Sequence, residues 1–194
     1  GVKGLFGARN VTLCEGSAKF EKADTLVVTK ADGSTEKVHG KKVIIAAGSV
    51  PTRIPGWPTD PNLVCTSDEA LHWDALPQRL LIVGGGVIGV EFACMMREYG
   101  VQVTIVEMMN QVMAPLDFEM AAMVHQHLRS RNVQLVLGDG LKAIESGSGG
   151  GLSVGLQSGR CAEAGMVALA IGVRPEYRLA KDAGLELGVR GTIA

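Results

Sequence analysis

The segment between residues 79 and 107 constrains the fold of this chain more than any other part of its sequence. It begins with an apolar run, Leu80–Val83, and continues with Gly84-Gly85-Gly86-Val87-Ile88-Gly89, a stretch ending at Gly100, and a second apolar run ending at Glu107. Short apolar runs with branched side chains are typical of buried parallel strands, and a glycine often ends a helix. The order strand, glycine turn, helix, strand therefore predicts a βαβ unit.

The spacing of Gly84, Gly86 and Gly89 is that of a turn that binds dinucleotides. The first glycine allows a tight turn, the second leaves room for a pyrophosphate beside the backbone, and the third lets the helix pack closely on the strand. Val87 and Ile88 open the predicted helix, whose free N–H groups and positive dipole end would face the phosphates. The alternative is a glycine turn in an α/β domain that binds no dinucleotide.

Glu107 predicts which dinucleotide would bind. It follows Gly84 by 23 residues, close to the spacing of about 20 expected for the acid that binds an adenine ribose. A 2′-phosphate beside this carboxylate would meet a repulsion of about 4 kcal/mol for unit charges about 4 Å apart at an effective dielectric of about 20. Residues 108–111 contain no Lys or Arg that could offset it. We therefore expect NAD(H) rather than NADP(H); a solvated acid at a strand end is the alternative for Glu107.

The composition excludes several other kinds of partner. The net charge is −1, with 46% hydrophobic and 20% charged residues, so the chain has no electrostatic footprint for nucleic acid or for an anionic membrane. No apolar run approaches the length of about 18 residues that a membrane span needs, and no secretory signal is visible. We expect a cytoplasmic protein with one or two domains.

No metal site and no catalytic residue is predicted. His125 and His127 stand two apart on a predicted helix and so point to different faces, which argues against a metal pair. Glu91 falls in the predicted first turn of the glycine-led helix, where the dipole stabilises an acid; a simple helix-start acid is the alternative. The cysteines include no CxxC pair, which argues against zinc and against a redox dithiol, and we expect them to be small buried hydrophobes. They are Cys14, Cys65, Cys94 and Cys161.

The rest of the pattern predicts a β-meander followed by further α/β elements. The expected strands of the meander are Val11–Cys14, Thr25–Thr29, Glu36–His39 and Lys42–Ala47. Pro51, Pro55 and Pro58 then mark the expected domain boundary. Three later helices are expected, over 66–71 with Ser67 as its cap, over Asp117–Arg129 and over Tyr177–Ala183. Two further strands are expected at Val133–Leu137 and Met166–Ile171. Between them we expect a hairpin formed by Leu141–Glu145 and Leu152–Leu156, with a loose tip at 146–151.

Three segments of the sequence together resemble the FAD-dependent pyridine nucleotide-disulfide oxidoreductases. They are Val43–Pro51 with Ile54-Pro55-Gly56, the unit Gly84–Glu107, and Ala170–Pro175, in the order in which the family has them. Residues 1–107 are most similar to dihydrolipoamide dehydrogenase, whereas residues 111–182 are more similar to the coenzyme A-disulfide reductase and NADH oxidase branch. The subgroup stays open, and a hybrid origin is one possibility.

The resemblance implies an α/β fold: a Rossmann-like NAD-binding domain with a parallel sheet and a β-meander, plus a partial flavin-domain β-segment at the N-terminus. It implies a partial FAD domain over 1–56, an NAD(H)-binding domain over 57–175, and a return toward the FAD domain over 176–194. The glycines and Glu107 would bind NAD(H), and Glu91 and Gly172 would lie near the nicotinamide. The first segment, which contains Ala46 and Gly48, would lie where the chain leaves the flavin domain.

Departures from the family pattern bear on function. Ala47 stands where the family usually has threonine, and Glu176 where it has asparagine. The family's first FAD motif, its redox cysteine pair, its late flavin motif and its C-terminal dimer domain are not found in this sequence. The reading is therefore an NAD(H)-binding central portion of an enzyme that moves hydride between NAD(H) and FAD. The alternatives are a free-standing NAD(H)-binding module without turnover and an NADH oxidase-like enzyme whose other parts lie on another chain.

Overall fold

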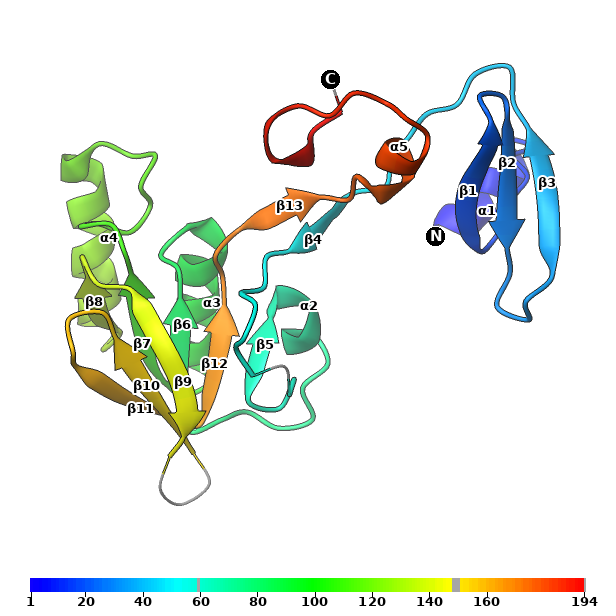
Figure 1. Cartoon of the computed structure of the whole chain (residues 1–194). Coiled ribbons are helices and arrows are strands. Elements are labelled where there is room, and N and C mark those ends of the chain that lie inside the picture. The colour runs from blue at the N-terminus through cyan, green and yellow to red at the C-terminus, as the bar shows by residue number, and fades with distance from the viewer. Residues whose placement is uncertain (59, 148–150, 194) are drawn as a thin grey trace. The chain divides into compact units, whose positions relative to one another are not determined.

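The computed structural model describes residues 1–58, 60–147 and 151–193 (Figure 1). The chain divides into two compact units. One is formed by Gly1–Val50 together with Arg174–Ala194, and the other by Pro51–Val173. The chain passes between them twice, and the two crossings pair as short strands, β4 (Ser49–Pro51) and β13 (Val173–Pro175).

The unit Pro51–Val173 is built on a five-stranded sheet with the strand order β5-β12-β6-β7-β8, in which every neighbouring pair is parallel. The predicted βαβ unit is confirmed, because β6 is followed by helix α3 and then by its sheet neighbour β7. The strands are β5 (Val64–Thr66), β6 (Arg79–Val83), β7 (Gln102–Glu107), β8 (Gln134–Leu137) and β12 (Met166–Leu169).

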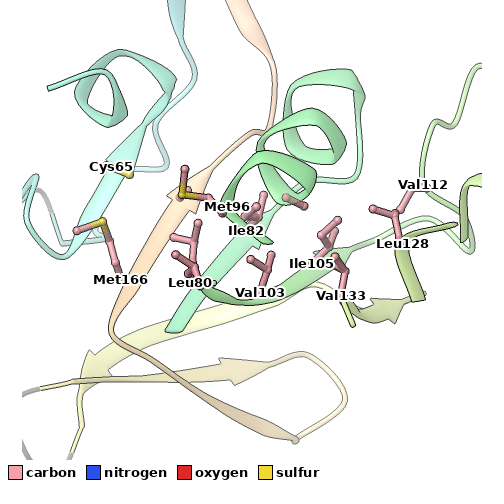
Figure 2. Packing of buried hydrophobic residues seen from close by; sticks show 13 residues of the cluster. Cys65, Leu80, Ile82, Met96, Val103, Ile105, Val112, Leu128, Val133 and Met166 are labelled. Atoms are coloured by element: carbon pink, nitrogen blue, oxygen red, sulfur yellow. The ribbon is translucent and has the colours of Figure 1, made fainter. Parts of the chain in front are cut away.

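Alternation along β6 explains why both faces of the sheet are covered. Leu80 and Ile82 point into one apolar cluster, with residues of α3 (Val87–Glu98) and α4 (Phe118–Ser130). Figure 2 shows this cluster, in which Ile82 of β6 and its pairing partner Ile105 of β7 take part. Leu81 and Val83 point into a second cluster on the other face. The central strands are therefore almost completely buried, as parallel strands between two layers usually are.

A three-stranded antiparallel sheet forms the second covering layer. Its order is β11-β10-β9, with β9 (Leu141–Ser146), β10 (Leu152–Leu156) and β11 (Cys161–Ala164). The predicted hairpin is confirmed, whereas β11 was not predicted, because Cys161 and Glu163 are exposed and give no apolar alternation. Residues 148–150, the centre of the predicted loose tip, lie outside the described residues.

Two helix starts, those of α2 (Ser67–Ala70) and α3, differ from the prediction. The cap of α2 is Thr66 rather than Ser67: its N–H donates to Glu69 Oε2 at 2.7 Å in a capping box. Helix α3 begins at Val87, after an extended Gly86, so Glu91 is its fifth residue and not part of the first turn. Asp117 precedes α4 as predicted, although its side chain makes no cap hydrogen bond.

The unit formed by the two chain ends contains an antiparallel sheet of order β1-β2-β3 (Ser17–Lys22, Thr25–Thr29, Thr35–His39). The predicted strand Val11–Cys14 is wrong: these residues pair with no strand among the described residues, and β2 is preceded by Ser17–Lys22 instead. The predicted strand Lys42–Ala47 is also wrong: this run pairs with no strand among the described residues, and Ile44 is 90% exposed. The remaining elements are α1 (Val2–Ala8), α5 (Arg178–Asp182) and a short 3-10 helix (Val189–Gly191).

Within the described part of the chain, no helix combines the length and apolar character needed to cross a bilayer.

Candidate dinucleotide site

A cleft of about 540 Å³ lies at the carboxyl ends of β6, β7 and β12. The chain runs from β6 through α3 to β7 on one side, whereas β12 lies on the other side of β6, so the strand order reverses at β6. Open α/β sheets bind ligands in the crevice at such a reversal point. All lining residues belong to the unit Pro51–Val173: Ile54, Trp57, Val83, Gly84, Gly86, Val87, Ile88, Val106, Glu107, Met108, Asp139, Gly140, Leu141, Ala170, Ile171 and Gly172.

The glycine bend that joins β6 to α3 is held tightly on one side and open on the other. Gly84 has φ +106°, and its N–H donates to the carbonyl of Val106 at 2.8 Å. A β-carbon on Gly84 would collide with the carbonyl of Ala170, and one on Gly89 with the carbonyl of Gly84. By contrast, a β-carbon on Gly86 would meet no atom within 4 Å. Only the position expected to face a pyrophosphate therefore borders free space.

Glu107 ends β7 at the rim of the cleft, with both carboxylate oxygens in use. Oε2 accepts a hydrogen bond from the N–H of Gly85 at 2.7 Å, and Oε1 accepts one from the N–H of Met109 at 2.8 Å. An ionised carboxylate has about four acceptor positions, so about two remain for further donors. Glu107 thus joins the glycine bend to the end of the second strand while keeping capacity to bind hydroxyls.

The segment that follows Glu107 folds back over the bend. The N–H of Met113 donates to the carbonyl of Gly85 at 2.7 Å. Val112 is completely buried, and its side chain lies so close to Gly85 that a β-carbon there would approach Val112 Cγ1 to 2.8 Å. Gly85 is therefore fixed through its N–H by Glu107 and through its carbonyl by Met113.

Asp139 is a cleft residue that the sequence analysis did not single out. Its side chain is 3% exposed and accepts hydrogen bonds from the Ser158 hydroxyl at 2.6 Å, the Ser158 N–H at 3.1 Å and Arg160 at 2.9 Å. The hydrogen bonds from Ser158 and Arg160 outweigh burial and lower the pKa of Asp139 to about 2. Asp139 therefore joins the β8–β9 connection to the β10–β11 turn as an anion at neutral pH. The only sequence signal was an acid before a glycine after a predicted strand.

The structure places the other predicted site residues in different environments. Val87, Ile88 and Gly172 line the cleft, and the side chains of Val87 and Ile88 are about half exposed at 56% and 48%. Glu91 is exposed on α3 and does not line the cleft. Ala46 and Gly48 belong to the other unit, where the carbonyl of Gly48 accepts a hydrogen bond from the N–H of Glu176.

The described residues contain no cluster of His, Cys, Asp and Glu that could hold a metal ion. Cys65 is completely buried and Cys161 is exposed, and all four cysteines are free thiols.

A sequence profile of the family described as Pyridine nucleotide-disulphide oxidoreductase matches residues 1–194. The chain belongs to this family. A dihydrolipoamide dehydrogenase of Chaetomium thermophilum is 33% identical over 100% of this chain and 40% of that protein. A dihydrolipoyl dehydrogenase of Haemophilus influenzae is also 33% identical, over 100% of this chain and 41% of that protein.

Solved structures of this family of oxidoreductases show the same fold. Reduced Bacillus anthracis CoADR-RHD matches with a TM-score of 0.84 and 36% identity, over 98% of this chain and 36% of that one. LpdA of Mycobacterium tuberculosis matches with a TM-score of 0.89 and 26% identity, over 98% of this chain and 43% of that one. The family is FAD- and NAD(H)-dependent. The chain spans about two fifths of the length of the curated relatives it matches.

Proposed function

We propose that this chain supplies the NAD(H)-binding portion of a flavin-dependent oxidoreductase that is similar to dihydrolipoamide dehydrogenase. The observation that carries the proposal is the open space at Gly86, in a cleft at the reversal point of the sheet and next to the carboxylate of Glu107. A tight glycine bend, a helix start and a strand-end acid are the three parts that a dinucleotide needs in one place.

Each part of NAD(H) has a counterpart among the cleft residues. The pyrophosphate would lie over Gly86 and the first N–H groups of α3, a 12-residue helix whose dipole favours an anion there. The adenine ribose would bind Glu107, whose negative charge favours NAD(H) over NADP(H). Gly172 would border the nicotinamide end. Glu91 does not line the cleft, and only the family resemblance would put it near the nicotinamide.

The bound nicotinamide would supply hydride chemistry, while the chain's own residues would bind and orient it. The exposed apolar side chains of Val87 and Ile88 would exclude water from one wall of the cleft.

Ala46 and Gly48 would contribute to the flavin side. We propose a partial FAD domain over 1–56, an NAD(H)-binding domain over 57–175 and a return toward the FAD domain over 176–194. The family resemblance implies a homodimer for the complete enzyme.

A binding module without turnover is the second candidate, and it would need only the cleft in Pro51–Val173. An NADH oxidase or coenzyme A-disulfide reductase portion is a further candidate, supported by the 36% identity to CoADR-RHD.

Titration of the purified 194-residue chain with NADH and with NADPH tests the proposal. We expect NADH fluorescence to change on binding, with NADPH bound at least about tenfold more weakly, as one repelled charge would require. A flavin absorbance spectrum that bleaches on adding NADH would support an assembled enzyme, whereas colourless protein that binds NADH would support the module. Equal affinity for NADH and NADPH, or no binding of either, would contradict the proposal.

A further inference from the structure

His125 is a buried histidine that has no part in the proposed dinucleotide contacts. It lies on α4, is 5% exposed, and its Nε2 accepts a hydrogen bond from the N–H of Val112 at 3.1 Å. The ring packs edge-on against Phe118, with ring centroids 6.5 Å apart. Because Val112 donates to Nε2, that nitrogen is unprotonated, and the neutral ring carries its proton on Nδ1.

The residue that His125 holds is the one that packs on the glycine bend. Val112 contacts Gly85 through its side chain, and the next residue, Met113, donates to the Gly85 carbonyl at 2.7 Å. Gly85 immediately precedes Gly86, where the open space lies. A continuous series of contacts therefore runs from His125 through Val112 to the bend.

The surroundings of His125 favour the neutral ring. Burial lowers the pKa of His125, and Arg129, one turn along the same helix, lowers it further. Residues 108–116, which supply Val112, contain no ionisable side chain. Helix α4 packs against β8, whose residues Gln134–Leu137 carry no ionisable side chain. The carboxylate of Glu107 is engaged with the N–H groups of Gly85 and Met109.

We infer that His125 is a positioning residue for the dinucleotide site, which holds Val112 and Met113 against Gly85 and so keeps the bend in its binding form. This inference rests on the proposed function, because the form of the bend matters only if a dinucleotide binds there. Protonation of Nε2 would replace an acceptor by a donor that faces the Val112 N–H, and the contact would be lost. NADH binding should therefore weaken as the pH falls through the lowered pKa of His125.

The test compares three variants of the 194-residue chain by NADH titration from about pH 8 to about pH 5.5, with NADH mixed immediately before each reading. His125→Gln keeps an acceptor near the position of Nε2 but does not titrate. His125→Leu removes the acceptor. His127→Leu is the matched control, because His127 is an exposed histidine on the same helix.

We expect wild type and His127→Leu to lose affinity together at a pH below the ordinary histidine pKa of about 6.5, and His125→Gln to keep its affinity across the range. His125→Leu should bind about three- to tenfold more weakly than wild type at about pH 8, the effect of one lost hydrogen bond. The inference is overturned if His125→Gln shows the same acid dependence as wild type.

A second measurement needs no ligand. The amide signals of Val112 and Met113, followed by NMR in the ligand-free chain, should shift with the titration of His125 in wild type and stay constant in His125→Gln. If wild type binds no NADH but these amides respond, the proposed function fails while the contact stands. If wild type binds NADH but the amides are indifferent to pH in both proteins, the positioning role fails while the proposed function stands.

Discussion

The N–H of Gly85 donates a 2.7 Å hydrogen bond to the side chain of Glu107, which joins the glycine bend after one strand to the end of the next. The two residues stand 22 positions apart, on opposite sides of α3 in the sequence. A single carboxylate can therefore do two things: it fixes the bend before a ligand arrives, and it offers its remaining acceptor positions to ribose hydroxyls.

Replacing Glu107 tests both roles. We expect Glu107→Ala to weaken NADH binding by about tenfold or more, because a charged hydrogen bond is lost. Its preference for NADH over NADPH should also fall, because the charge that repels a 2′-phosphate is gone. Fluorescence titration with both nucleotides measures the two effects together.

Glu145→Gln serves as the matched control for Glu107, because Glu145 is an exposed acid on β9 that does not line the cleft. It should bind NADH as wild type does. Unchanged affinity and unchanged selectivity in Glu107→Ala would show that this carboxylate does not bind the ribose.

Two glycines of the bend should respond in opposite ways to added side chains. Gly86 has φ −73° and open space around it, so Gly86→Val should fold, losing at most about 1 kcal/mol from the helix cap, and should lose NADH binding. In Gly89→Ala the new methyl group would collide with the carbonyl of Gly84, which should lower the stability of the unit by about 1–3 kcal/mol or more. Thermal unfolding and NADH titration of both variants separate the effects, and retained binding in Gly86→Val would exclude a pyrophosphate at this position.

The sequence predicted the elements whose pattern is decided locally. The continuous apolar run of β6 and the glycine spacing that follows it specify a buried strand and a bend, whatever surrounds them. The strands predicted at Val11–Cys14 and Lys42–Ala47 have suitable residues, yet a strand also needs a partner with a free edge. Neither segment meets a partner strand among the described residues. Pairing is a property of the fold and not of the segment.

The candidate site was predictable where one segment supplies it. The glycines and Glu107 lie within one βαβ unit, so their spacing carried the information. Asp139 binds Ser158 and Arg160, which lie 19 and 21 positions away in the sequence, and His125 binds Val112, which lies 13 positions away. None of these segments contains a motif. Neither residue differs in sequence from an ordinary surface acid or a helix histidine. Only the fold shows that one joins two turns at the cleft and the other holds the segment over the bend.

The free cysteines should differ strongly in reactivity. Cys65 is fully buried, and burial, followed by the nearby negative charge of Glu69, raises its pKa to about 12. Since the thiolate is the reactive form, Cys65 should resist a maleimide reagent at about pH 8 in the folded chain, whereas exposed Cys161 should react. Mass spectrometry of peptides after brief labelling, with and without urea, measures this. Labelling of Cys65 at the rate of Cys161 without urea would contradict its burial.

Asp139 should make the stability of its unit depend on pH in a defined window. Its pKa is lowered from 3.8 to about 2 in the folded chain by hydrogen bonds from Ser158 and Arg160. A carboxylate with a depressed folded pKa stabilises the fold above its unfolded pKa, and this stabilisation is lost as the pH falls through the folded value. Wild type should therefore be more stable than Asp139→Asn at about pH 7, and the difference should shrink between about pH 4 and about pH 2.

Urea unfolding followed by tryptophan fluorescence suits this measurement, because both tryptophans, Trp57 and Trp73, lie in the unit that contains Asp139. Asp74→Asn is the control, since Asp74 is exposed in the same unit, and it should follow wild type at every pH. If Asp139→Asn differs from wild type by the same amount at about pH 7 and about pH 2, the variant acts through packing and not through the charge. If the stability difference between wild type and Asp139→Asn disappears in acid, while Asp74→Asn matches wild type throughout, the anion itself joins the two turns beside the cleft.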